Sequence, residues 1–201
     1  MSFTKKAEIS VCIAVVISII FSVITFAGTS EKIRNDVLRI HIIANSDSDE
    51  DQSLKLKVRD ALLESGNRIF SGTVDAENAV EIITPEISVL EKTAKRIITE
   101  NGFDYDVKIE ISREFFTTRT YADVTLPAGK YMALRVIIGE GNGHNWWCVM
   151  FPAMCVPSAE PENRMEAVFD SAETELVRKR PQFEPKFKII EIYESIKNRF
   201  E

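Results

Sequence analysis

A strand followed by a helix is predicted by residues 37–62, VLRIHIIANSDSDEDQSLKLKVRDAL. Apolar residues alternate with Arg39 and His41 over the first part of this stretch, which is typical of a β-strand with one face in a core. Ser48 stands where a helix N-cap is expected, and the three acidic residues after it suit the positive end of a helix dipole. Apolar residues then recur at helical spacing until Gly66, which predicts the end of the helix.

Helices and strands continue through the rest of the chain. A helical block over residues 75–100 is interrupted at Thr84-Pro85, which predicts two helices or a kink. Further strands are predicted at 107–112, 121–126, 131–138 and 146–151, and helices at 165–176 and 187–200, with an extended tether from Pro181 to Pro185. An antiparallel meander that follows helices indicates an α+β fold, in which an antiparallel sheet is packed by helices. No Ser/Gly-rich linker divides residues 30–201, which predicts one domain.

The N-terminal segment differs from this domain. Lys5 and Lys6 precede an uncharged apolar run from Ile9 to Gly28, whose 20 residues are enough to span a bilayer about 30 Å thick. The positive-inside rule keeps the two lysines in the cytoplasm and places residues 30–201 outside. Residues 1–29 therefore read as a signal anchor or a signal peptide. We expect an uncleaved anchor, because the apolar core is longer than that of a cleaved signal.

Composition excludes several classes of protein. The chain has 201 residues, 45% of them hydrophobic, which indicates a globular rather than a disordered protein. It has no strong basic run, so we expect no nucleic-acid partner. Residues 1–29 carry Lys5, Lys6 and Glu8, so residues 30–201 have a net charge of −7 against −6 for the whole chain. An acidic exported domain of this kind is not a polybasic binder of membrane surfaces.

One of the three cysteines lies in the N-terminal apolar run and two lie in the exported part. Cys12 lies in the apolar run, whereas Cys148 and Cys155 lie in the exported part, where an oxidising compartment favours a disulfide between them. The alternative is two buried thiols on a strand and the turn after it. A zinc site is disfavoured because only two histidines accompany these thiols and no compact motif joins them.

Two patterns that resemble ligand-binding loops fail on their spacing. Asp47, Asp49 and Asp51 alternate like the start of a calcium loop, but the sixth and twelfth positions hold Gln52 and Val58 instead of Gly and Glu. The glycines at 139, 141 and 143 lack the spacing and the following helix of a dinucleotide-binding loop, so a hairpin loop is predicted. We therefore expect no metal, no cofactor and no small-molecule substrate.

Histidines and carboxylates offer the one enzymatic alternative. His41 could form an acid–base pair with Asp47 or Asp60, and a cell-envelope hydrolase could use His41 or His144 with Asp47 or Glu140. The sequence contains no HExxH, GxSxG or Walker motif, so the expectation is a protein that is not an enzyme.

Several motifs together resemble one known family. They are Ile42–Ser48 with Asp51-Gln52 and Leu54–Asp60, then Thr118–Tyr121 with Leu126–Tyr131, then Leu134–Gly141, and finally Asn145–Pro152 with Cys155. In this order and spacing they resemble the stage II sporulation protein R family. The resemblance spans about residues 37–157, and the last of these motifs is the most specific.

This resemblance implies a developmental signal of endospore-forming bacteria. Such a protein is made in the forespore and exported into the space between the two membranes around it. There it is thought to activate a membrane-embedded aspartic protease of the mother cell, which removes the pro-sequence of the mother-cell sigma factor E. A cell-envelope hydrolase, as above, and a structural envelope protein held by its terminal helices are the alternatives.

Residues that contact the protease are expected on physical grounds at three places. The first is the turn with Asn45, Ser46 and Asp47, and the second is the pair Arg119 and Tyr121. The third is the loop and strand with Glu140, Asn145, Trp146 and Trp147. The two adjacent tryptophans point to opposite faces of a strand, so one is expected in a core and the other is open to a partner or covered by a helix.

Overall fold

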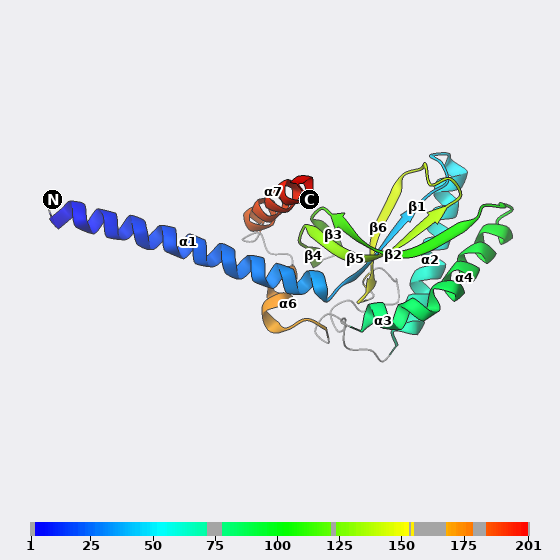
Figure 1. Ribbon diagram of the computed structural model, residues 1–201, viewed down its shortest axis with the longest axis horizontal. Helices are drawn as coiled ribbons and strands as arrows, with labels where there is room; N and C mark the ends of the chain where they lie inside the picture. Colours follow the sequence, from blue (N-terminus) through cyan, green and yellow to red (C-terminus); the bar gives the residue numbers. More distant parts are fainter. Residues whose placement is uncertain are drawn as a thin grey trace.

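The computed structural model describes residues 3–71, 78–121, 124–152, 154, 168–178 and 184–200 (Figure 1). Its helices are α1 (Phe3–Asn35), α2 (Asp49–Ile69), α3 (Ala79–Ile83), α4 (Ile87–Glu100), α6 (Ser171–Val177) and α7 (Glu184–Phe200), with the 3-10 turn η1 (Thr84–Glu86) between α3 and α4. Its strands are β1 (Leu38–Ile43), β2 (Val107–Phe116), β3 (Arg119–Tyr121), β4 (Val124–Leu126), β5 (Gly129–Ile138) and β6 (Asn145–Phe151). The predicted α+β class is confirmed.

The main sheet has the strand order β2-β5-β1-β6. Strand β1 pairs with β5 in parallel and with β6 antiparallel, and β2 pairs with β5 antiparallel. The sheet is therefore mostly antiparallel but mixed. The predicted hairpin between β5 and β6 is wrong because β1 lies between them, and the Gly139–Gly143 loop instead crosses the end of β1.

The two faces of this sheet belong to different cores. One face packs on α2, α3 and α4, as Figure 1 shows. Its core includes Leu38, Ile40 and Ile42 of β1, Leu54 and Val58 of α2, and Leu90 and Ile98 of α4. The other face is covered at one end by α6, α7, the β3–β4 hairpin and the last turns of α1. That core includes Phe26, Ile33, Phe116, Tyr131, Val149, Leu176 and Phe187.

Helix α2 begins as predicted but ends later. The Ser48 hydroxyl accepts a hydrogen bond from the Asp51 N–H, which confirms the N-cap. Gly66 does not stop the helix, which runs on to Ile69. A Cβ at Gly66 would lie 2.6 Å from the terminal methyl carbon of Met150, so this glycine allows β6 to approach the helix.

Two predicted elements are divided in the structure. The segment Tyr121–Leu126 is not one strand, because β3 ends at Tyr121 and β4 begins at Val124, and the two pair antiparallel. Within the helix predicted at 165–176, Val168 is helical and the chain leaves the helix at residues 169 and 170 before α6 begins at Ser171. Asp170 is extended and its side chain accepts from the N–H groups of Ala172 and Glu173, which makes it an N-cap.

The remaining helix boundaries agree more closely with the prediction. The interruption at Thr84-Pro85 is confirmed as η1 between α3 and α4. Pro185 lies in the first turn of α7 rather than in a tether, a position that proline tolerates. Pro181 and residues 165–167 lie outside the described part of the chain.

Helix α1 joins the apolar run to the domain without a break. It is long and apolar enough to cross a membrane, as the sequence predicts. It also continues through the predicted boundary between residues 29 and 30, and Phe26 and Ile33 are buried in the second core. Figure 1 shows its N-terminal half extending alone from the molecule.

The cysteines are distributed as follows. Cys12 on α1 is free and exposed. Cys148 is buried in β6, and Cys155 lies outside the described residues, so a disulfide between Cys148 and Cys155 stays a prediction.

Candidate functional site

A loop wraps around the carboxyl end of β1. The backbone N–H groups of Asn142 and Gly143 donate to the carbonyl oxygens of Asn45 (3.1 Å) and Ala44 (2.9 Å). The side-chain Oδ1 of Asn45 accepts a hydrogen bond from the Glu140 N–H at 3.0 Å. This crossing brings together two regions that are almost a hundred residues apart in the chain. A Cβ at Gly143 would lie 2.2 Å from the Ser46 carbonyl oxygen, so only glycine fits at this crossing.

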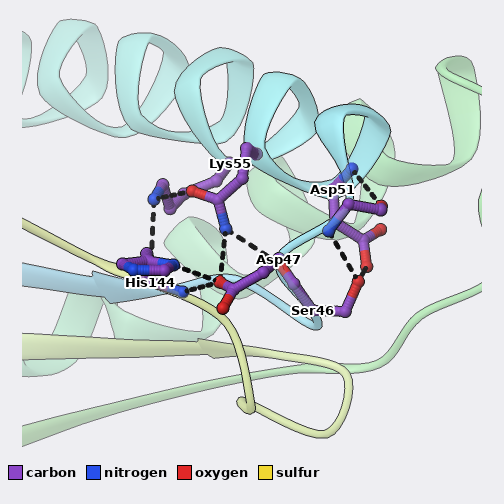
Figure 2. A network of polar contacts seen from close by, with 7 residues as sticks. Ser46, Asp47, Asp51, Lys55 and His144 are labelled. Atoms are coloured by element: carbon purple, nitrogen blue, oxygen red, sulfur yellow. Dashed lines mark hydrogen bonds and ion pairs between the residues drawn. The ribbon is translucent and has the colours of Figure 1, made fainter.

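Asp47 and His144 meet on the outer side of this crossing (Figure 2). Asp47 Oδ1 accepts a hydrogen bond from the His144 backbone N–H at 2.6 Å and lies 2.5 Å from His144 Nδ1. The hydrogen bond from the His144 side chain holds the pKa of Asp47 below its usual value. Both side chains are more than half exposed, so this pair is available to a partner.

Lys55 joins this pair to helix α2. Its Nζ donates to Gln52 Oε1 (2.5 Å) and to the His144 carbonyl oxygen (2.8 Å). Gln52 in turn donates to the Ser46 carbonyl oxygen at 2.8 Å. Lys55 is buried, and burial lowers its pKa although Asp47 acts in the opposite direction. The lysine therefore connects the two crossing segments instead of facing solvent.

Asp51 is the buried carboxylate of the same turn. Its Oδ2 accepts hydrogen bonds from Ser46 Oγ (2.6 Å) and Asn45 Nδ2 (2.8 Å). Burial alone raises the pKa of Asp51, but these hydrogen bonds outweigh it and hold the pKa below its usual value. Asp51 thus orders the turn that presents Asp47. Within the described residues, no three His, Cys, Asp or Glu side chains gather as metal ligands would.

His41 lies near this end of β1 but on the opposite face of the sheet from α2. Its Nδ1 lies 2.5 Å from Glu114 Oε2, and its Nε2 lies 2.8 Å from Asn145 Oδ1. The imidazole stacks on the indole of Trp147, and Arg135 Nε lies 3.5 Å from the other oxygen of Glu114. The His41 side chain is therefore held on three sides by residues of β2 and β6.

The two tryptophans point to opposite faces, as predicted, and both are half-buried. Trp146 packs against the core between the sheet and helices α2 to α4. The guanidinium carbon of Arg59 lies 4.5 Å from the centre of the Trp146 ring. Trp147 contacts His41 and Phe116 on the other face. Side chains of the domain itself cover much of each indole, so neither is a fully open anchor for a partner.

Tyr121 and Arg119 lie away from the β1 end. Figure 1 shows the β3–β4 hairpin at the end of the sheet nearest α1. The buried guanidinium of Arg39 donates to the Tyr121 hydroxyl at 2.5 Å and to the Cys148 carbonyl oxygen at 3.2 Å. It also lies 4.1 Å from the centre of the Phe116 ring. Tyr121 therefore has a structural role, whereas the side chain of Arg119 is exposed.

The structure thus assembles part of the predicted site. We call the residues around the loop crossing the β1-end surface: Asn45, Ser46, Asp47, Glu140, His144 and Asn145. Trp147 lies next to this surface, because it stacks on His41 and His41 contacts Asn145. Arg119 and Tyr121 lie away from this surface. The sequence interpretation missed Glu114 and Arg135, which hold His41. The signal available was the alternation of polar residues along β2, which places Glu110, Ser112 and Glu114 on one face.

Comparison with known proteins agrees with the order of motifs. A model of the stage II sporulation protein R family matches residues 34–160, which include β1, α2, the whole sheet and the β1-end surface. The chain belongs to the stage II sporulation protein R family. The resemblance noted over residues 37–157 is confirmed.

One curated relative is the stage II sporulation protein R of Bacillus subtilis (strain 168). The chain is 33% identical to this relative over 123 residues, which are 61% of the chain and 55% of the relative. The chain thus matches little more than half the length of that relative. No solved structure matches the chain. Helices α6 and α7 and most of α1 lie outside the residues that the family model matches.

Proposed function

We propose that this family member is an exported signalling protein that activates a membrane-embedded aspartic protease of the mother cell. Activation leads to processing of the pro-form of sigma factor E. The observation that carries the proposal is the family match over residues 34–160, which supports a role in sporulation. Helix α1 supports export from the forespore into the space between the two membranes, because it is apolar and follows Lys5 and Lys6.

The β1-end surface is the proposed contact with the protease. Its turn is held by hydrogen bonds from Asn45, Ser46 and Gln52, so little conformational entropy is lost when a partner binds. Asp47, Glu140 and Asn145 are exposed on it. Binding would favour the active conformation of the protease by population shift, which requires only that this surface bind the active form more tightly.

A hydrolase is the second candidate, because the structure forms two histidine–carboxylate pairs. His41 lies 2.5 Å from Glu114, and His144 lies 2.5 Å from Asp47. The second ring nitrogen of His41, Nε2, contacts the side chain of Asn145, which is not a nucleophile. The nearby Ser46 hydroxyl donates to Asp51, an arrangement unlike that of a serine activated by histidine. A hydrolase would lose its function when one histidine is replaced in a folded protein.

The test is co-expression of the full chain, the candidate protease and the sigma-factor precursor in a host that does not sporulate. Precursor cleavage is expected with the full chain and with a chimera that carries another signal anchor in place of residues 1–17. No cleavage is expected when export is blocked by deleting those residues. Because Phe26 and Ile33 are buried in the domain, the chimera must retain the rest of α1.

Surface variants then locate the contact. The triple variant Asp47→Ala, Glu140→Ala, Asn145→Ala is expected to reduce cleavage at least tenfold at equal protein level. The matched control is Glu64→Ala with Lys92→Ala, two exposed residues on α2 and α4. Full cleavage with the triple variant would remove the β1-end surface from the proposal. Loss of cleavage with His41→Ala alone, in a folded protein, would favour the hydrolase.

A further inference from the structure

Helix α7 is apolar on two opposite sides. Phe187 and Ile190 face the second core and are buried, together with Glu194. Ile189, Ile192, Tyr193 and Ile196 face outward, and each is at least 50% exposed. A helix that is apolar on both sides is normally covered on both sides. Among the residues that the structure describes, the domain covers only one side of α7.

This outward face stands apart from the rest of the domain surface. Among the described residues outside α1, five large apolar side chains are exposed, and Val89 is the one that does not lie on α7. The other four lie on α7 at positions i, i+3, i+4 and i+7, so they form one row along a single helix. Such a contiguous patch indicates an interaction surface, whereas an isolated residue such as Val89 does not.

Helix α7 lies beside the last turns of α1, close to the end of the apolar run. The ring of Phe187 lies 5.4 Å from that of Phe26, edge to face, and Phe26 is near the end of the apolar run Ile9–Gly28. Further along, Arg34 Nη2 lies 3.4 Å from Glu194 Oε1. These two contacts fix α7 beside the last turns of α1, as Figure 1 shows. An apolar run of this length ends at the surface of the bilayer it crosses.

Helix α6 also reaches the apolar run. A groove of about 400 Å³ is lined by Ser18, Phe21 and Thr25 of α1 and by Ala172, Glu175 and Leu176 of α6. Domain residues therefore flank α1 before its apolar run ends. Because α1 runs from the apolar run into the domain without a linker, membrane insertion of α1 would bring the domain against the headgroups.

We infer that the outward face of α7 docks into the outer surface of the bilayer that α1 spans. Ile189, Ile192, Tyr193 and Ile196 would lie at the boundary of headgroups and acyl chains, where amphipathic helices bury their apolar face by about 5–10 Å. Of the charged residues beside the row, Glu194 is turned inward to Arg34, and Lys188 lies 3.5 Å from Glu191. The inference rests on the membrane insertion of α1 proposed above.

The test measures membrane depth at single cysteines. In a full-length background without native cysteines (Cys12→Ser, Cys148→Ala and Cys155→Ala), the variants Ile192→Cys and Ile196→Cys carry an environment-sensitive fluorophore. The protein is placed in vesicles of phosphatidylcholine and phosphatidylglycerol that contain lipids with a nitroxide at a shallow or a deep position. Val89→Cys is the matched control, since it is an exposed β-branched residue on α4. Ile17→Cys, in the middle of the apolar run, reports the insertion of α1.

Quenching at positions 192 and 196 is expected to exceed that at position 89 at least threefold and to be stronger with the shallow nitroxide. Equal quenching at 192, 196 and 89, with strong quenching at 17, would overturn the inference. So would absence of quenching at 17, because α1 would then not be inserted. Oxidative cross-linking of Ile192→Cys between two copies, without quenching, would assign the row to a dimer instead. The assay contains no protease, so these outcomes are independent of the precursor-cleavage test.

Discussion

The imidazole of His41 lies flat on the indole of Trp147, with ring centroids 3.7 Å apart and planes 11° from parallel. These two residues entered the sequence interpretation in different roles, one in a possible acid–base pair and the other as a partner contact. In the structure they form one packed unit with Glu114 on β2. This unit closes the sheet face next to the β1-end surface.

The two histidines are expected to differ in their effect on stability. His41→Ala removes two hydrogen bonds and the stack on Trp147, so it should lower the free energy of unfolding by about 2 kcal/mol. His144→Ala should change it by less than about 1 kcal/mol, because the side chain is 79% exposed. Urea unfolding of the full chain in detergent, followed by tryptophan fluorescence, measures both. A larger loss for His144 than for His41 would contradict the packing described.

Two glycines provide a matched test of the loop crossing. A Cβ at Gly143 would lie 2.2 Å from a backbone oxygen, whereas a Cβ at Gly66 would lie 2.6 Å from the end of a methionine side chain. Because the backbone yields less easily than a flexible side chain, Gly143→Ala should cost about 1–3 kcal/mol and more than Gly66→Ala. Thermal unfolding of the two variants gives the comparison. Equal costs for the two variants would contradict the argument that the backbone at Gly143 yields less easily than the Met150 side chain at Gly66.

The buried hydrogen bond between Arg39 and Tyr121 should contribute measurably to stability. Tyr121→Phe leaves a buried cation without this partner, and a hydrogen bond to a charged group contributes about 1.5–3 kcal/mol. The control is Tyr193→Phe, which removes the hydroxyl of a tyrosine that is 59% exposed. Denaturant midpoints at constant m-value report the difference. No change with Tyr121→Phe would show that another group replaces the hydroxyl.

Stability at acid pH should depend on Asp51. The pKa of this carboxyl is lower in the folded chain than its ordinary value, so folding favours the ionised form. Its contribution is present above the unfolded pKa of about 3.9 and is lost as the pH falls through the folded pKa. Asp51→Asn should therefore flatten the decline of unfolding free energy below about pH 4. Asp49→Asn, an exposed change in the same helical turn, serves as the control and should retain the wild-type slope.

Local chemistry of the sequence was enough to predict many elements. The Ser48 cap, the break at Thr84-Pro85 and the long apolar helix depend on neighbouring residues, because capping, proline geometry and membrane insertion act over a few turns of chain. The ordered motifs were enough to predict the family.

Tertiary structure alone decided the pairing and the site. Nothing local to β1 indicates that it separates β5 from β6, since strand order depends on which distant strands bury its two faces. The contact of His41 with Glu114 and the contact of Asp47 with His144 follow from that order. Helix α7 shows the same limit. Its sequence predicts a helix at 187–200, but only packing decides which apolar residues are buried, because a helix can present only one side to a given neighbour.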